Sequence, residues 1–149
     1  MIAPLISPMI KQVIMLFERI PHGAIALLAR ISIATVFLRS GLLKLDGWSD
    51  GTTLALFREE YRLPLLPPEL AAYAGTAAEL LLPPLLLAGL FTRFAALALL
   101  GMTLVIQLFV YPNAFDTHGT WAVCFLYLMR FGAGALSLDR LIATRFGEK

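Results

Sequence analysis

Glu79 is the residue whose position most clearly indicates chemistry, because it lies within the apolar run GTAAELLLPPLLLAGLFTR. Arg30 and Arg130 lie in two other apolar runs of the chain. A charge at the centre of a bilayer costs at least about 2.5–3.5 kcal/mol, so buried charges pair or face a polar cavity. Counting along each run at about 1.5 Å per residue places the three side chains at similar depth. We therefore predict a buried ionic cluster of Arg30, Glu79 and Arg130, which either fixes helix packing or forms a ligand pocket with Glu79 as its proton carrier.

Pro83 and Pro84 follow Glu79 in the same run. Proline has no backbone N–H, so Pro83 leaves the carbonyl of Glu79 without its helical partner, and Pro84 does the same to Leu80. In lipid, such carbonyls are tolerated only where protein, water or a ligand satisfies them. We expect a kinked helix with free carbonyls beside the carboxylate.

A second polar group is expected at the opposite, outer level of the membrane, and it consists of Lys44, Gln107, Asp116 and His118. Of these, His118 could transfer protons near neutral pH or ligate a metal. A metal bound by His118, Asp116 and a loop glutamate is only weakly indicated, so we predict no metal site. Lys44 lies near the end of its run and could also extend to the lipid headgroups.

The composition indicates the setting of these residues. The chain has 149 residues, 59% of them hydrophobic and 15% charged, with a net charge of +2. So small a soluble domain cannot bury that much apolar surface. Four runs approach the roughly 20 apolar residues that a spanning helix needs, over residues 23–45, 68–90, 94–111 and 119–138. The sequence therefore predicts an all-α integral membrane four-helix bundle with no reason to bind nucleic acid.

Two segments outside the four runs are also expected to be helical. Residues 9–20, MIKQVIMLFERI, are too short to span and lie between Pro8 and Pro21, so they form either an amphipathic surface helix or the first turns of the first span. The first loop, DGWSDGTTLALFREEYRLPLLPPEL, should be structured, either as a cap over a cavity or as an interfacial anchor. We divide the chain into an amphipathic segment (1–22), the four-helix domain (23–142) and a cytoplasmic tail (143–149).

The distribution of Lys and Arg predicts the orientation. The N-terminal segment, the turn between the second and third runs, and the tail all carry basic residues, whereas the loop PNAFDTHG carries none. Basic residues favour the cytoplasmic side. We expect a multi-pass protein of the bacterial inner membrane with both termini in the cytoplasm.

Several short motifs resemble the DoxX family of small four-helix membrane proteins. They occur in ARISIATVFLRSGLLKL, in GTAAELLLPPLLLAGLFTR and in RFGAGALSLDRL. The residues that match the family pattern are Phe37, Gly41, Lys44, Gly89, Arg93, Gly132, Gly134, Ser137 and Asp139, while Ala133 replaces the usual proline. The first loop is most similar to a subgroup that accompanies multinuclear-iron peptide-modifying enzymes in metal-stress gene clusters.

The resemblance leaves two functions open. The chain has no electron-transfer cofactor motif of its own, so in the first reading it is at most a membrane subunit of an oxidoreductase complex, acting with a protein partner and a quinone. In the second reading it is a non-catalytic anchor or export partner in a metal-stress peptide-modification pathway. A homo-oligomer is compatible with either reading.

Overall fold

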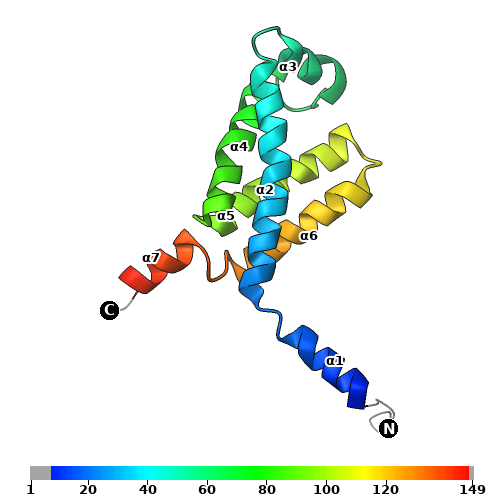
Figure 1. Cartoon of the computed structure of the whole chain (residues 1–149). Coiled ribbons are helices and arrows are strands. Elements are labelled where there is room, and N and C mark those ends of the chain that lie inside the picture. The colour runs from blue at the N-terminus through cyan, green and yellow to red at the C-terminus, as the bar shows by residue number, and fades with distance from the viewer. Residues whose placement is uncertain (1–7, 148–149) are drawn as a thin grey trace.

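The computed structural model describes residues 8–147, and all regular structure within them is helical. Two long helices come first in the bundle, α2 (His22–Asp46) and α4 (Pro68–Ala88). Two more follow, α5 (Thr92–Val105), which the π-helical segment η3 (Ile106–Val110) extends, and α6 (Phe115–Phe131). They pack as two antiparallel pairs, α2 with α4 and α5 with α6, as Figure 1 shows. The prediction of an all-α fold is confirmed for this part of the chain.

Three of the helical segments are long and apolar enough to cross a membrane, namely His22–Asp46, Pro68–Ala88 and Thr92–Val110. Their bounds lie within two residues of the predicted runs. The fourth, α6, has 17 residues and ends at Phe131, where Gly132 leaves the helix with φ 76°. The predicted span over 119–138 is therefore wrong at its C-terminal end, and a fourth crossing stays a prediction.

Two short elements cover the end of the bundle that lies away from the chain termini. They are α3 (Thr52–Ala55) and the π-helical segment η2 (Leu56–Tyr61), which together form the ordered first loop. Phe57 is buried against Ala71 and Ala72 of α4. Figure 1 shows this loop folded over the top of the bundle, so the prediction of a structured first loop is confirmed.

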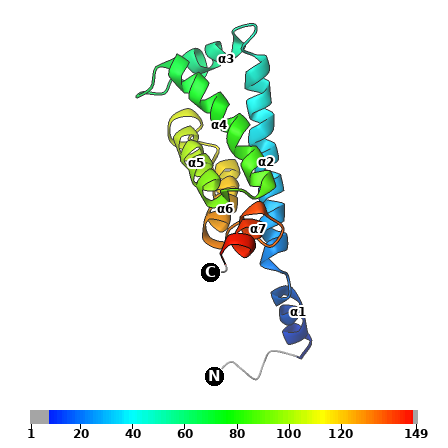
Figure 2. The same cartoon turned by 90° about the vertical axis from the view of Figure 1, so that its left-hand side faces the viewer.

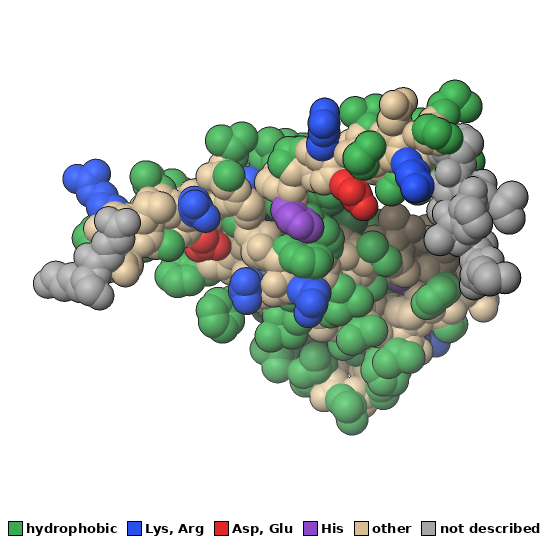
Figure 3. Space-filling model, turned by 90° about the horizontal axis from the view of Figure 1, so that it is seen from below, with side chains coloured by type: hydrophobic (Ala, Val, Ile, Leu, Met, Phe, Trp, Pro, Cys, Tyr) green, Lys and Arg blue, Asp and Glu red, His purple; other side chains and the backbone are tan. Residues whose placement is uncertain are grey.

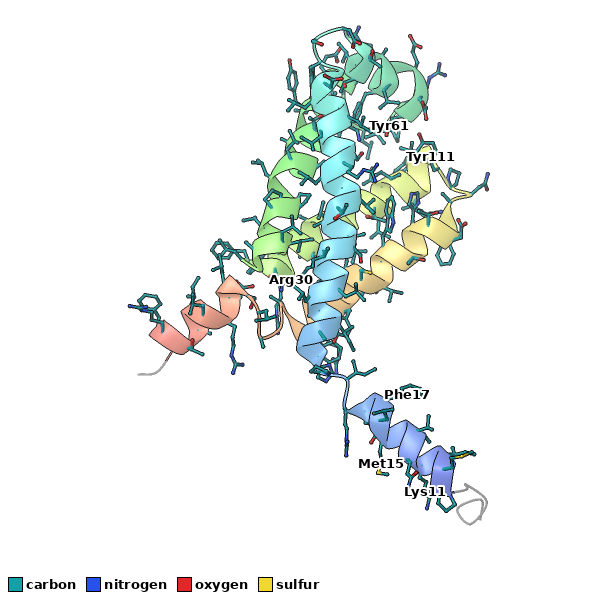
Figure 4. All side chains as sticks on the ribbon, in the orientation of Figure 1. Lys11, Met15, Phe17, Arg30, Tyr61 and Tyr111 are labelled. Atoms are coloured by element: carbon teal, nitrogen blue, oxygen red, sulfur yellow. The ribbon has the colours of Figure 1, made fainter. Side chains whose placement is uncertain are left out.

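The remaining helices, α1 (Pro8–Glu18) and α7 (Leu138–Phe146), lie at the opposite end from this loop, as Figures 1 and 2 show. All residues of α1 are exposed, and its apolar side chains include Met15 and Phe17, labelled in Figure 4. Whether α1 lies on a membrane surface stays a prediction. The parts of the N-terminal segment and of the tail at residues 1–7 and 148–149 fall outside the described residues.

The core is built largely from small side chains. Ala26, Ala34 and Ala96 are almost completely inaccessible to solvent, and they pack with larger residues such as Leu99 and Phe125. In a bilayer, helices associate by close packing more than by hydrophobic exclusion, and small residues let their backbones approach. This packing fixes the register that brings the polar side chains of α2 and α4 together.

Candidate functional site

The carboxylate of Glu79 forms an ion pair with Lys44. The Lys44 Nζ lies 2.8 Å from Oε2 and 3.0 Å from Oε1 of Glu79, and the two side chains are 8% and 5% exposed. Ser40 completes the group: its hydroxyl donates to Glu79 Oε1 at 3.1 Å and accepts from Lys44 Nζ at 2.7 Å. The three residues form a closed hydrogen-bonded triangle between α2 and α4.

A close contact between the helices places this triangle. Gly41 of α2 lies against the backbone of Glu79, and a Cβ at Gly41 would come within 2.9 Å of the Glu79 carbonyl. Lys44 and Ser40 are one helical turn apart on the same helix, so both reach the carboxylate once the backbones touch. Arg30, Phe37, Gly41 and Lys44 are all buried and share one face of α2.

The predicted cluster of Arg30, Glu79 and Arg130 is wrong. Arg30 is buried, but its guanidinium donates to three carbonyls at the other end of the bundle, those of Leu86 and Leu87 at 3.3 Å and of Leu136 at 2.5 Å. The carbonyls of Leu86 and Leu87 belong to the last turn of α4, where carbonyls have no hydrogen-bond partner within the helix. Leu86 is seven residues beyond Glu79, or about 10 Å along the helix.

Arg130 is exposed and lies over the ring of Phe131, 5.4 Å from its centroid. It belongs to the last turn of α6. The sequence placed it near mid-span because it extended the fourth run to residue 138, but the helix ends at Phe131. Arg130 therefore lies at the terminus-bearing end of the molecule, away from Glu79.

The prolines do not terminate α4. The helix continues through Pro83 and Pro84 to Ala88, and Pro83 is buried. The carbonyl that Pro83 deprives of its helical partner, that of Glu79, faces Gly41. The free carbonyl is thus covered by the neighbouring helix, whereas the arginine expected to satisfy it binds elsewhere.

Two cavities are lined by both Lys44 and Glu79. The larger, about 280 Å³, is mostly apolar, and its lining includes Phe57, Tyr61, Ala78, Met102 and Ile106 beside Lys44 and Glu79. The smaller, about 190 Å³, is more polar, and its lining includes Ser40, Tyr61, Tyr111, His118 and Trp121 beside the same ion pair. Both are bounded by the π-helical segments η2 and η3, a geometry that occurs frequently at functional sites.

The outer group predicted from the sequence is brought together in part. Lys44 and His118 line the smaller cavity, and His118 Nδ1 lies 2.7 Å from Gln107 Oε1. Asp116, by contrast, is exposed on the first turn of α6. Among residues 8–147, no three His, Cys, Asp or Glu side chains gather as metal ligands, so the structure offers no support for the weak alternative of a metal at His118.

Sequence reasoning missed two tyrosines that close this end of the site. Tyr111 donates to the Glu60 carboxylate and packs edge-on against Tyr61, with 6.0 Å between the ring centroids; Figure 4 labels both. The bond to Glu60 raises the pKa of Tyr111, and burial raises the pKa of Tyr61. No pattern in the chain distinguishes a tyrosine of such a site from one that anchors the chain at the membrane interface.

The remaining motif residues have structural positions at the other end. Asp139 accepts from the backbone N–H groups of Phe91 and Thr92, and so caps the start of α5. Gly89 ends α4 with φ 67°, where a Cβ would lie 2.3 Å from Arg30 Nη1. Ser137 caps α7 through the N–H of Arg140.

The other motif positions shape the backbone and the core. Phe37 packs edge-on against Trp121 and Phe125. Gly132 and Gly134 both have positive φ in the segment after α6.

Comparison with known proteins identifies the group to which this architecture belongs. The DoxX family matches residues 25–112, which contain most of α2, all of α4 and α5, and the whole Lys44–Glu79 site. The chain belongs to the DoxX family. An uncharacterised protein of Haemophilus influenzae is similar to this DoxX protein, with 32% identity over 145 residues, 89% of this chain and 92% of the relative. No solved structure matches it. Family and apolar helices together make it a multi-pass membrane protein.

Proposed function

We propose that this DoxX protein is a small inner-membrane subunit of a redox system and that it binds a quinone in the apolar cavity beside Glu79. The proposal rests on the buried Lys44–Glu79 ion pair, which lines a cavity whose other walls are apolar and aromatic. Ligand sites in proteins combine an apolar lining with a few polar groups that fix orientation. A quinone ring has an apolar face and carbonyl edges, which suit such a lining.

The residues of the larger cavity fit the head group of such a compound. Its volume of about 280 Å³ is close to the lower end of the usual range for ligand pockets. Phe57 and Tyr61 supply ring faces on one side, and Ala78 leaves room on α4. Lys44 lines the cavity, and its Nζ would donate a hydrogen bond to a carbonyl of the quinone.

The quinone would supply the redox chemistry, and the chain would handle protons. Glu79 lines both cavities, so its carboxyl group would take up a proton from the smaller, polar cavity and donate it to the quinone as electrons from the partner reduce that ligand. That cavity holds room for several water molecules beside His118 and Ser40. Lys44 retains its charge and offsets the charge of the carboxylate between transfers. Electrons come from a protein partner, which the proposal requires.

Quinone binding can be measured without knowing the partner. The purified protein in nanodiscs is titrated with a short-chain quinone, and quenching of Trp121 fluorescence is followed in a Trp48→Phe background, because Trp121 lines the smaller cavity. Ala78→Phe fills the larger cavity and should abolish quenching, whereas Ala77→Phe, on the exposed face of the same helix, should not. Equal quenching in both variants would refute the assigned cavity.

The proton role has its own test. Glu79→Gln should retain much of the quenching but abolish quinone-linked turnover once the partner is reconstituted. The matched control is Glu69→Gln, an exposed carboxylate on the same helix that pairs with Arg58. Turnover that survives Glu79→Gln would rule out Glu79 as the proton carrier.

A second candidate is a non-catalytic anchor or export partner, and the ordered first loop favours it. Arg58, Glu59 and Arg62 are exposed on that loop, while Phe57 and the Glu60–Tyr111 bond fix it to the bundle. A fixed, charged surface suits a peptide or a soluble enzyme. Alanine at Glu59 and Arg62 should then disrupt function without affecting quinone quenching, and full function in that variant would exclude the anchor role. In both cases the basic, terminus-bearing end is assigned to the cytoplasm.

A further inference from the structure

A third cavity, of about 540 Å³, lies at the opposite end of the bundle from the ion pair. Its lining comes from the starts of α2 and α5 (His22, Arg93), the end of α6 (Phe131), the segment after it, and α7 (Arg140). Because α2 and α5 are spanning helices, a cavity at their ends lies at the depth of the lipid headgroups. It is separate from both cavities of the proposed quinone site.

The cavity has unpaired positive charge. Arg93 and Arg140 line it, and neither guanidinium takes part in an ion pair within residues 8–147. Asp139 also lines it, but each of its carboxylate oxygens already accepts a backbone N–H, from Phe91 at 2.8 Å and from Thr92 at 3.0 Å. The two arginines are therefore available to an anion from outside.

The shape of the floor lets an anion approach these arginines. Gly132 and Gly134 both have positive φ, so the segment after α6 turns at two positions that carry no side chain. Even a Cβ at Gly132 would lie 3.7 Å from Arg93 Nε and Nη2. The absence of a side chain there keeps the edge of the Arg93 guanidinium open.

The rim of the cavity is apolar and exposed. Phe91 is 61% exposed and Phe94 is 72% exposed, and both line the cavity. Figure 3, which views this end of the molecule, shows Lys and Arg side chains among exposed hydrophobic ones. A soluble anion would gain nothing from contact with exposed phenylalanines, whereas a phospholipid places its acyl chains against them and its phosphate against the arginines. Basic pockets between spanning helices on the cytoplasmic side bind anionic headgroups in this way.

We propose that this cavity is a binding site for an anionic glycerophospholipid, whose phosphate contacts Arg93 and Arg140 and whose acyl chains lie along Phe91 and Phe94. The site would tie α5 to α7 across the headgroup layer. It is independent of the quinone proposal, since no residue of the ion pair takes part.

Competition between lipids tests the proposal on the wild-type protein. The full chain is purified in mild detergent, and native mass spectrometry measures how much phosphatidylglycerol and phosphatidylcholine of the same acyl length it retains. We expect a clear preference for phosphatidylglycerol. Equal retention of the two lipids overturns the proposal. The proposal also fails if inorganic phosphate alone stabilises the protein against unfolding as much as phosphatidylglycerol does, because the ligand would then be a soluble anion.

A pair of variants locates the site. Arg93→Gln with Arg140→Gln should weaken phosphatidylglycerol binding about 30-fold, since each basic residue near an anionic lipid surface contributes about 1 kcal/mol and 1.4 kcal/mol is a tenfold change. The matched control is Arg19→Gln with Arg145→Gln, two exposed arginines at the same end of the molecule that do not line the cavity. An equal loss in the control, or no loss in the first variant, would contradict the assignment. If the first variant fails to fold, the lysine pair at the same positions keeps the charge and should keep the lipid preference.

Discussion

Removing one partner of the buried Lys44–Glu79 pair should destabilise the protein far more than removing both. Each single substitution leaves a charge buried between α2 and α4, with side chains only 5–8% exposed. The loss of one partner of a buried pair costs about 3–5 kcal/mol, whereas replacing the whole pair by uncharged groups of similar volume is often nearly neutral. The relevant variants are Lys44→Met, Glu79→Gln and the two combined.

The magnitude follows from the contacts. Lys44→Met removes three donor contacts, to Ser40 and to both oxygens of Glu79, but retains the packing of the aliphatic stem. Glu79→Gln retains an acceptor for Ser40 and removes only the charge. For a chain of this size, 1 kcal/mol shifts Tm by about 2–4 °C, so each single variant should unfold roughly 6–20 °C lower. The combined variant should recover most of that loss.

The assay is thermal unfolding in detergent, followed by circular dichroism. Additive effects in the combined variant, or single variants that unfold within about 2 °C of the wild type, would refute the assigned pairing.

Three further substitutions test the architecture around this pair. Gly41→Ala should cost about 1–3 kcal/mol, because its Cβ would meet the Glu79 backbone at 2.9 Å and force α2 away from α4; an unchanged Tm would contradict that contact. Asp139→Ala should cost about 0.5–2 kcal/mol and speed amide hydrogen exchange at the first residues of α5, since both N–H groups that it caps lose their acceptor. Tyr111→Phe should lower stability by a constant amount below about pH 10. That difference should close as pH rises through the raised pKa of Tyr111, because ionisation ends its donation to Glu60. A difference that persists in strong alkali would show that the bond does not contribute.

The spans could be predicted from the sequence because they depend on a long-range sum of apolar residues. The predicted run at 23–45 became α2 at His22–Asp46, and the run at 94–111 became α5 and η3 at Thr92–Val110. The end of α6 could not be predicted in the same way. The apolar run continues past Phe131, but the positive φ of Gly132 ends the helix there. The backbone conformation of a glycine inside an apolar run cannot be predicted from the sequence.

The hydrogen-bond and ion-pair partners of the charged side chains could not be predicted from the sequence, for a different physical reason. Depth was estimated by counting residues, as if the helices shared one centre and their side chains extended sideways. In the structure Arg30 extends to the unpaired carbonyls at the end of α4, while Lys44 turns inward to Glu79 instead of outward to the headgroups. Long basic side chains can place their charge several ångströms along the helix from their own Cα. A similar depth of two residues, counted from the sequence, therefore does not identify which side chains pair.

The division of the family motifs between the two ends of the bundle bears on how they should be interpreted. At the terminus-bearing end, the Asp139 cap and the packing of Gly89 against Arg30 account for these residues without any ligand. At the other end, Lys44 and Glu79 satisfy each other, but they do so on the wall of two cavities that a purely structural pair would not need. A bundle that needed only rigidity would be served as well by apolar side chains at both positions. The charged pair therefore makes sense where a ligand or a proton must reach it, and this is why the chemistry is assigned to that end of the molecule.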